Sequence, residues 1–161
     1  MKKIIIAIDS FKGCLTSAEA GKAAEKGIKS INPFCHTSVI PIADGGEGLL
    51  DVLITATKGK YITLSAHGPL MKMAKTHYGL SGNGRTAIIE MAAISGLPLV
   101  PIEQRNPMLT TTFGTGELIK DALNKGCRNF IIGIGGSATN DAGLGMLQAL
   151  GFRFLDKSGH T

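Results

Sequence analysis

Residues that could bind an anion or move a proton gather in four short clusters of the sequence. Each cluster is rich in Gly, Ser, Thr, Asp or Lys and lies just before a predicted helix, and three directly follow an apolar run that predicts a buried strand. In open α/β sheets, ligands bind at the carboxyl ends of the strands, where helix N-termini offer free N–H groups to anions. The clusters are Asp9–Gly13, Asp44–Gly48, Thr110–Gly116 and Gly135–Asp141.

The cluster Asp9–Gly13 brings a carboxylate, a hydroxyl and an ammonium close together. Asp9 could hold a metal ion or a hydroxyl of a sugar acid, Ser10 adds a hydroxyl, and Lys12 could act as a point charge on a phosphate. The alternative is an acid in a turn beside a solvated lysine. From spacing alone, the two interpretations are equally supported.

The cluster Asp44–Gly48 combines two carboxylates with three glycines. Glycines such as Gly45 and Gly46 let the backbone approach a ligand closely, while the acids could bind Mg²⁺ or accept a hydroxyl proton. The alternative is a helix cap, with Glu47 favourably placed on the helix dipole. Capping is the better interpretation for Glu47, and the role of Asp44 stays open.

The loop Gly135–Asp141 carries two glycines, two hydroxyls, an amide and an acid within seven residues. A capping loop needs one such oxygen, so this density favours a ligand site. Its glycines and hydroxyls could line a phosphate or a carboxylate, and Asp141 is a candidate metal ligand or base. We expect this loop, after Ile134, to converge with the turns after Ile8 and Ala43.

The cluster Thr110–Gly116 carries a weaker signal. It is either a second anion cradle or chain leading into a capped helix, and the two glycines that flank Thr115 slightly favour the cradle. The sequence lacks the G-x-x-x-x-G-K-[ST] pattern of a Walker A loop and has no G-x-G-x-x-G directly after a strand. Glu90 lies outside these clusters, and we interpret it as forming an ion pair with Arg85 within a β-hairpin.

The elements that must position these clusters alternate between strand and helix. Ile4–Ile8 predicts a strand buried on both faces, and Thr16 with Glu19 forms a capping box that starts a helix. A second strand is predicted at Ser38–Ala43, with Pro41 at an edge or bulge. Strand, helix and strand in this order imply a right-handed crossover and a parallel sheet.

Antiparallel pairing is predicted further along the chain. Tyr61–Ala66 predicts a strand, and Lys75–Leu80 pairs with Arg85–Met91 around the turn signal Asn83-Gly84. We therefore predict an α/β fold with a parallel, Rossmann-like three-layer sheet and a second α/β unit that contains an antiparallel hairpin. The predicted units are residues 1–67 and residues 68–161.

Composition narrows the class of protein. The 161 residues carry a formal net charge of +5 and are 43% hydrophobic, without tryptophan. The basic residues are scattered and have no interleaved aromatic side chains, which argues against a nucleic-acid partner. The three cysteines form no disulfide or zinc pattern, which fits a reducing cytoplasm, and no segment has the length of a membrane span.

Blocks along essentially the whole chain together resemble the bacterial glycerate kinases of the type I family. Ile8, Cys14 and Ala142 replace residues that are commonly Pro, Ser and Gly in the family, and none of these changes removes a candidate ligand group. Family members are much longer, so the resemblance covers their N-terminal part. The matching blocks are Ala7–Gly13, Pro41–Gly48, Arg85–Ala92, and Thr110–Glu117 running on to Gly133–Asp141.

The resemblance implies a two-lobed cytoplasmic enzyme that transfers the γ-phosphoryl group of ATP, with Mg²⁺, to a hydroxyl of D-glycerate and yields a phosphoglycerate. Such transfer depends on positioning and charge neutralisation, which the polar clusters could supply. Its partners would be glycerate and ATP, without nucleic acid or membrane, and an oligomer is left open. The region beyond the resemblance would supply further groups to the site.

Carried over to this sequence, the resemblance assigns three sets of site residues. The predicted catalytic residues are Asp44, as proton acceptor, with Lys12 and Asp141. Asp9 and Asp141 are the predicted Mg²⁺ ligands. The predicted substrate- and phosphate-binding residues are Ser10, Gly45, Gly46, Thr115, Gly135, Gly136, Ser137, Thr139 and Asn140.

Three alternatives stay open at this stage. Loops that favour anions do not specify glycerate, so another small-molecule kinase with an acidic acceptor fits as well. A non-catalytic module that binds a nucleotide or phosphate is the second alternative. The third is a purely structural lobe in which every loop is a capping device.

Overall fold

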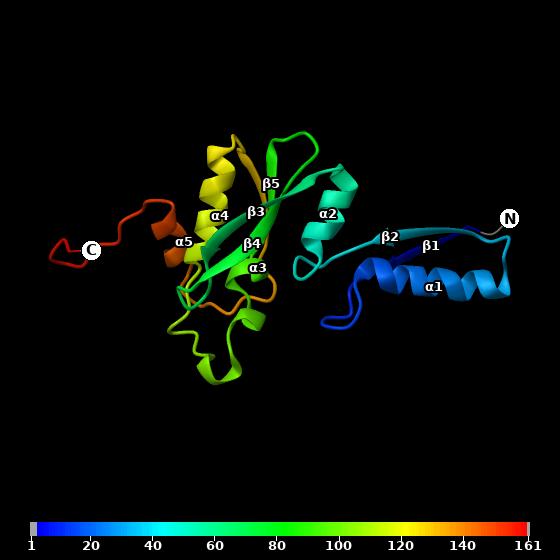
Figure 1. The fold of residues 1–161 in the computed structure, drawn as a ribbon, viewed down its shortest axis with the longest axis horizontal. Helices are drawn as coiled ribbons and strands as arrows, with labels where there is room; N and C mark the ends of the chain where they lie inside the picture. Colours follow the sequence, from blue (N-terminus) through cyan, green and yellow to red (C-terminus); the bar gives the residue numbers. More distant parts are fainter. Residues whose placement is uncertain (1–2, 161) are drawn as a thin grey trace.

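The computed structural model describes residues 3–160, which form two units in chain order (Figure 1). The first unit consists of strand β1 (Lys3–Ile8), helix α1 (Ser17–Ile31) and strand β2 (His36–Pro41). The two strands pair in parallel, as predicted, and α1 connects them. Figure 1 shows that this unit extends to one side of the rest of the molecule.

Helix α1 begins at the predicted capping box and packs closely on β2. The Thr16 side chain accepts a hydrogen bond from the amide of Glu19, and the Glu19 carboxylate accepts one from the amide of Thr16. On the face toward β2, a Cβ on Gly21 would lie 2.3 Å from Cγ1 of Val39. Glycine therefore sets the short distance between helix and strand.

The second unit contains the remaining elements. Its sheet has the strand order β3-β4-β5-β6, antiparallel except for the parallel pair of β5 and β6. The elements are α2 (Leu49–Thr57), β3 (Lys60–His67), β4 (Met73–Leu80), β5 (Thr86–Glu90), α3 (Ala92–Ser95), short 3₁₀ turns at Leu97–Leu99 and Ile102–Gln104, α4 (Phe113–Asn124), β6 (Asn129–Gly133) and α5 (Leu144–Ala149).

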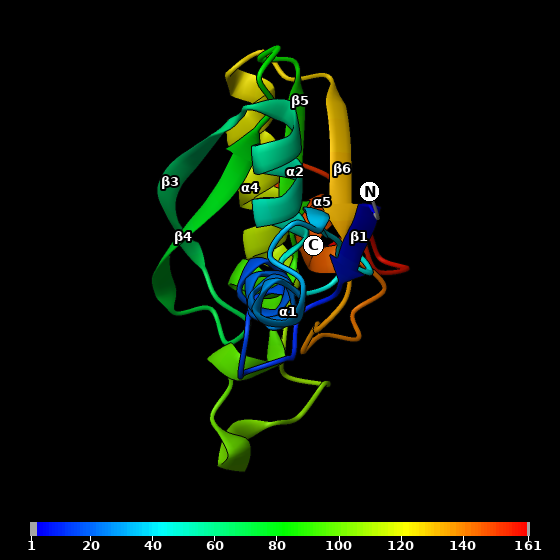
Figure 2. The ribbon, with the colours of Figure 1, turned by 90° about the vertical axis from the view of Figure 1, so that its right-hand side faces the viewer.

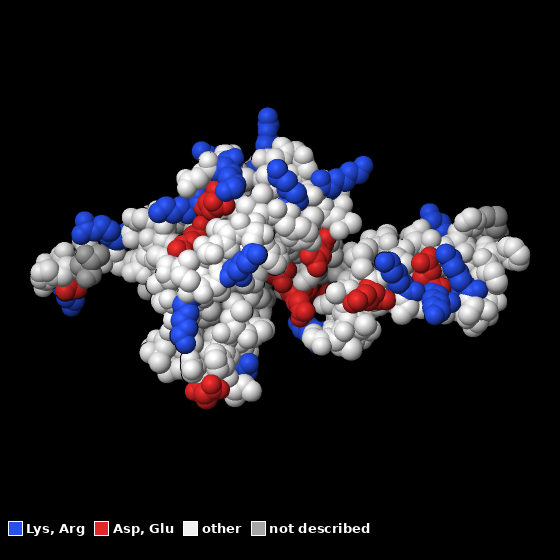
Figure 3. All heavy atoms as spheres, in the orientation of Figure 1, with Lys and Arg blue, Asp and Glu red and all other residues white. Residues whose placement is uncertain are grey.

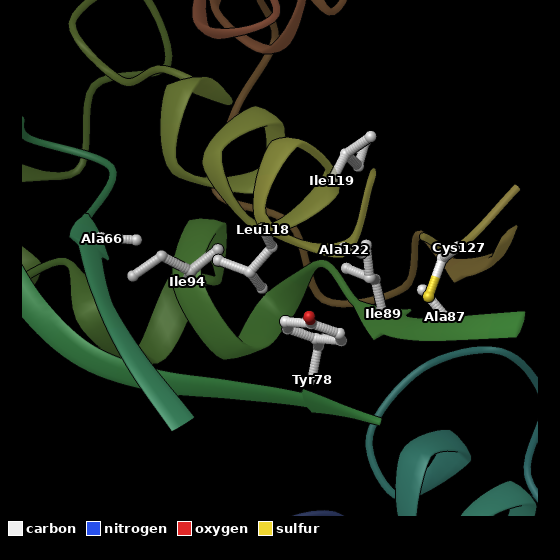
Figure 4. Close-up of a cluster of buried hydrophobic side chains, with 9 residues drawn as sticks. All are labelled: Ala66, Tyr78, Ala87, Ile89, Ile94, Leu118, Ile119, Ala122 and Cys127. Atoms are coloured by element: carbon white, nitrogen blue, oxygen red, sulfur yellow. The ribbon is translucent and has the colours of Figure 1, made fainter. Parts of the chain in front are cut away.

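Helices cover both faces of this four-stranded sheet, as the end-on view of Figure 2 shows. On one face, Leu50 and Ile54 of α2 pack against Ile88. On the other face lies the larger core, which Figure 4 shows between α3, α4 and the strands. Each fully buried Ile or Leu, such as Ile89 and Leu118, stabilises the fold by roughly 1.5–3 kcal/mol.

The α/β class, the parallel sheet and the second unit with its hairpin are confirmed. The second unit has three layers, whereas β1 and β2 carry α1 on one face. The expectation that Ile4–Ile8 is buried on both faces is therefore wrong, since Ile5 is 59% exposed. The predicted boundary at Gly68 falls in the turn between β3 and β4, two strands that pair along their full length. In this structure the connection between the units lies at residues 42–48, because α2 packs on β4 and β5.

Two further expectations, on Pro41 and on membrane-spanning helices, can be compared with the structure. Pro41 occupies the last position of β2, opposite Ile8, where the missing N–H costs the ladder little. None of the helices within residues 3–160 is long and apolar enough to cross a membrane.

Candidate active site

Ser17, at the start of α1, ties together the two strand ends that carry the first two polar clusters. Its hydroxyl donates to the carbonyl of Ile8 and accepts a hydrogen bond from the amide of Ile42 at 3.0 Å. Because β1 and β2 are parallel, both segments leave the sheet at the same edge. The clusters that begin at Asp9 and Asp44 therefore start side by side.

The turn Asp44–Gly48 is shaped by its glycines and by one internal hydrogen bond. Gly45 and Gly48 have φ angles of 97° and 91°, a backbone region that favours glycine. Asp44 Oδ1 accepts from the amide of Gly46 at 3.0 Å, and Asp44 Oδ2 lies 3.9 Å from Lys12 Nζ. Both charged side chains are largely exposed, so the ion pair adds little stability and both charges stay accessible to a ligand.

The loop after β6 meets this turn directly. The amide of Gly135 donates to the carbonyl of Gly45 at 3.2 Å. A Cβ on Gly135 would lie 2.7 Å from Cα of Gly46, so the two backbones touch where only glycine fits. The turns after Ala43 and Ile134 therefore meet, as expected.

Together the three turns surround a hollow of about 430 Å³, which we call the Lys12–Asp44 hollow. Its polar lining consists of the Lys12 ammonium, the Asp44 carboxylate and glycine backbone. Its apolar lining comes from α2 and β6, including Leu49 and Ile132. An ammonium, a carboxylate and close-approach backbone in one hollow suit a small anion that carries a hydroxyl group.

A second hollow, of about 450 Å³, also lies at the end of β6, and we call it the Asp141 hollow. The two hollows share Ile132 and Ile134 as lining residues, so they are neighbours. The polar clusters therefore converge on two adjoining hollows. The predicted site residues that line the second one are Thr115, Ser137, Thr139, Asn140 and Asp141.

Hydrogen bonds hold the loop Gly135–Asp141 in shape. Ser137 Oγ accepts from the amide of Thr139 at 3.0 Å and pairs with the Thr139 hydroxyl at 2.7 Å. The carbonyl of Gly136 accepts from the amide of Leu97 at 3.0 Å.

Thr115 is buried in the first turn of α4. Its hydroxyl already pairs with that of another buried residue, Ser95, at 2.8 Å.

Asp141 closes this loop against the starts of α4 and α5. Its carboxylate accepts hydrogen bonds from the amides of Thr112, Gly143 and Gly145, at 2.8, 3.1 and 3.1 Å. Burial alone would raise the pKa of the Asp141 carboxyl, but the hydrogen bonds from Thr112, Gly145 and Gly143 outweigh burial and lower this pKa below its ordinary value. Asp141 is therefore ionised in the folded chain near neutral pH.

A third hollow, of about 400 Å³, lies between the two units, and we call it the junction hollow. Acidic side chains gather where the units meet (Figure 3), and Glu47, Asp51 and Glu90 line the hollow. Ser10 also lines it, and the Ser10 hydroxyl is buried without a hydrogen-bond partner among the described residues.

Comparison with known proteins gives one consistent result. The family model described as the glycerate kinase family matches residues 4–161. The chain is 56% identical to a glycerate kinase of Bacillus subtilis over 98% of its length, and 51% identical to glycerate 2-kinase of Escherichia coli, also over 98%. A crystal structure of putative glycerate kinase 2 from Salmonella typhimurium LT2 matches 99% of the chain with a TM-score of 0.84 and 50% identity.

The chain belongs to the glycerate kinase family. The resemblance that the four sequence blocks indicate is thereby confirmed. The chain spans 41% of the length of the Bacillus subtilis relative and 42% of the Salmonella structure. Family members thus carry a further region, and the hollows described above are built from the part that they share with this chain.

The structure places eleven of the thirteen predicted site residues in the three hollows, and Asp9 and Gly136 line none of them. Lys12, Asp44, Gly45, Gly46 and Gly135 come together in the Lys12–Asp44 hollow. Five others line the Asp141 hollow, as given above, and Ser10 lines the junction hollow. Asp9 accepts a hydrogen bond from the amide of Ser10 at 2.7 Å and does not share a hollow with Asp141 among these described sites.

Two residues of these hollows carry roles that sequence patterns did not indicate. Glu90, interpreted as a partner of Arg85, turns toward α2 and accepts from the amide of Leu50 at 3.3 Å. Burial raises the pKa of Glu90, and the hydrogen bond from Leu50 only partly opposes this increase. Thr112 links Asp141 to α5, because its hydroxyl also accepts from the amide of Met146. Both contacts join residues more than 30 positions apart, so local spacing carries no signal for them.

Proposed function

We propose that this chain forms part of a glycerate kinase that transfers the γ-phosphoryl group of ATP to a hydroxyl of D-glycerate, producing a phosphoglycerate and ADP. Family membership supports the reaction class. The observation that carries the assignment to this site is the meeting of Lys12, Asp44 and Gly135 around one hollow. Phosphoryl transfer needs positioning and charge neutralisation more than covalent chemistry, and this hollow offers both.

In this proposal Asp44 accepts the proton of the attacking glycerate hydroxyl. Its Oδ1 is held by the amide of Gly46, which leaves Oδ2 to face the ligand beside Lys12. The Lys12 ammonium offsets negative charge on the glycerate carboxylate or on the phosphoryl group in transfer. Both groups are exposed in the chain as it stands, so a bound substrate and the further region of the family would have to exclude water from them.

The loop Gly135–Asp141 is proposed to bind the second anionic group. Gly135 and Gly136 allow its backbone to approach a phosphate or a carboxylate closely. The side chains of Ser137, Thr139 and Asn140 line the neighbouring hollow and can donate hydrogen bonds there. The two adjoining hollows would then hold the two substrates next to each other at the end of β6.

The residues predicted to bind Mg²⁺ do not form a common site. No group of three or more His, Cys, Asp or Glu side chains suited to a metal ion occurs among residues 3–160. Asp141 already accepts hydrogen bonds on both oxygens, and Asp9 does not join it in a hollow.

The proposal is tested by phosphorylation of D-glycerate. The 161-residue chain, extended by the remaining region of a relative, is given ATP and D-glycerate, and ADP release is followed with a coupled assay. NMR of the product identifies the hydroxyl that carries the phosphate. The name of the Escherichia coli relative, glycerate 2-kinase, makes the 2-hydroxyl the first position to test.

Two results would contradict the proposal. Turnover with another hydroxy acid in preference to glycerate, in a panel of acceptors, would indicate a different kinase. Thermal stabilisation by ATP or glycerate without any turnover in the extended protein would indicate a binding module.

A further inference from the structure

The carboxylate of Asp141 lies where three segments meet: the loop Gly135–Asp141, the start of α4 and the start of α5. Its Oδ2 accepts from the amide and hydroxyl of Thr112 at 2.8 and 2.9 Å and from the amide of Gly145 at 3.1 Å. Its Oδ1 accepts from the amide of Gly143 at 3.1 Å and from the Thr112 hydroxyl at 3.1 Å. The hydroxyl of Thr111 is a weaker, more distant donor to Oδ2, at 3.4 Å.

These donors use up the hydrogen-bonding capacity of the side chain. A carboxylate offers roughly four lone-pair sites on its two oxygens. Three amides and the Thr112 hydroxyl already occupy them. A metal ion could bind Asp141 only if several of these bonds broke, and buried amides would then be left unpaired.

On the side toward α5, Asp141 is closely packed. A Cβ on Gly145 would lie 2.0 Å from the hydroxyl oxygen of Thr111 and 2.9 Å from Asp141 Oδ2. The Thr112 hydroxyl, which donates to Asp141, accepts from the amide of Met146 at 2.9 Å. One carboxylate and one hydroxyl therefore join the first turns of both helices.

The same network orients the loop that carries the candidate anion-binding groups. The hydroxyl of Thr110 donates to the carbonyl of Ala138 at 2.8 Å, and the amide of Ala138 donates to the carbonyl of Ser95 at 2.9 Å. The middle of the loop is thus fixed to the segment just before Thr112, and its end is fixed by Asp141 itself. Ser137 and Thr139 lie on either side of the Ala138 anchor point.

We infer that Asp141 is a positioning residue, which holds the loop Gly135–Asp141 against α4 and α5, and that it does not ligate a metal ion. Its effect on catalysis, which rests on the proposed glycerate kinase function, acts through the orientation of Ser137, Thr139 and Asn140. Substrate binding should therefore depend on Asp141 more strongly than the chemical step does.

The decisive experiment measures amide hydrogen exchange by NMR in the 161-residue chain and in Asp141→Asn. Asparagine keeps the shape of the side chain but replaces one accepting oxygen with a donor. We expect exchange at the amides of Thr112, Gly143 and Gly145 to become faster by on the order of tenfold or more. The matched control is Asp156→Asn, because Asp156 likewise accepts from the amides of Ser158 and His160, far from the hollows. Unchanged exchange at the three amides in Asp141→Asn would overturn the inference.

A second pair of variants decides the question if Asp141→Asn fails to fold. Thr112→Val removes the hydroxyl between Asp141 and Met146, whereas Thr112→Ser keeps it. We expect faster exchange at Gly143 and Gly145 in Thr112→Val and wild-type exchange in Thr112→Ser. Equal exchange in both variants would contradict the positioning role.

Kinetics of the extended protein separate positioning from metal binding. In Asp141→Asn we expect KM for ATP or glycerate to rise about tenfold, with a smaller change in kcat, and the Mg²⁺ concentration for half-maximal rate to stay within about twofold. A rise of about tenfold or more in that Mg²⁺ concentration, with amide protection intact, would instead identify a metal ligand. If the wild-type extended protein does not phosphorylate glycerate, the proposed function fails, and the exchange measurements still decide the role of Asp141.

Discussion

At the scale of single residues, the two candidate carboxylates Asp44 and Asp141 differ in their surroundings. Asp44 has one oxygen bonded to its own turn and one that faces Lys12 at 3.9 Å. Asp141 accepts hydrogen bonds on both oxygens from backbone and hydroxyl donors. A general base needs an oxygen that is free to take a proton, so Asp44 is the better candidate.

We predict that Asp44→Asn in the extended protein lowers kcat by roughly 10²–10⁴-fold, the usual contribution of a general base. Because the Asp44 side chain is 59% exposed, the variant should fold and melt like the wild type. Steady-state ADP release and a thermal melt measure the two effects. The matched control is Asp156→Asn, another exposed turn acid, and near-normal turnover in Asp44→Asn would remove Asp44 from the mechanism.

At the scale of elements, glycine contacts set how closely the turns approach each other. We predict that Gly135→Ala separates the loop from the turn Asp44–Gly48, since the new Cβ would lie 2.7 Å from Cα of Gly46. Affinity for phosphate or glycerate, measured by isothermal titration calorimetry, should fall by about tenfold or more. Unchanged affinity would show that contact between the two turns is not needed for binding.

The matched control lies in α1. Gly27 sits in the helix interior, and a Cβ added there would meet no atom within 4 Å beyond its own stretch of helix. Gly27→Ala should therefore leave ligand affinity unchanged and stabilise the chain by roughly 0.8–1 kcal/mol, the difference in helix propensity. Urea unfolding measures this gain.

Glu90, at the end of β5, yields a prediction about pH. Burial and the nearby acids Asp51 and Glu47 raise its pKa, so the folded state binds the proton more tightly than the unfolded state does. The stability linked to this group is present below the ordinary pKa of 4.5 and is lost as pH rises through the raised value. Glu90→Gln should thus be more stable than the wild type at pH 8 and show no advantage at pH 4.

Urea unfolding at the two pH values tests this expectation. Glutamine keeps an oxygen for the amide of Leu50, so the hydrogen bond at the start of α2 survives the change. The exposed Glu103→Gln is the control and should leave stability unchanged at both pH values. A loss of stability in Glu90→Gln at pH 8 would show that the ionised carboxylate is needed there.

At the scale of the whole molecule, apolar surface is left open on both units. On the first unit, Ile5 and Ile40 are exposed on the β1–β2 sheet. On the second, Ile131 is exposed in the middle of β6, the edge strand of its sheet, and Ile134 is exposed just after this strand. An apolar edge strand is a template for association, and relatives carry a further region of chain that could cover it.

We predict that the 161-residue chain binds the dye ANS and associates as its concentration rises, and that the extended protein does neither to the same degree. Dye fluorescence and light scattering measure the two properties. Ile5→Lys should reduce dye binding without loss of the fold, because Ile5 is 59% exposed. Its neighbour Ile6, which is buried, is the contrast: Ile6→Lys should unfold the first unit. Equal dye binding by the wild type and Ile5→Lys would contradict the prediction.

The sequence by itself determined the local elements and the family. Strand Lys3–Ile8, the capping box at Thr16 and the parallel crossover follow from spacing and side-chain type, and the same holds for the turns that flank Gly45 and Gly135. These features depend on neighbours within a few positions, which a linear pattern contains. The four blocks that resemble glycerate kinases extend this local information along the whole chain.

Only the tertiary structure decided which acids have free oxygens and where the two units separate. Asp141 is bonded to Thr112, and Glu90 to Leu50, across 29 and 40 positions, so no local spacing could predict either contact. The boundary predicted at Gly68 falls between β3 and β4, which pair along their full length, because a change from parallel to antiparallel pairing does not show which strands share a sheet. Whether a carboxylate is free to bind a ligand or accept a proton depends on the hydrogen-bond donors that folding brings to it. Sequence spacing does not show those donors.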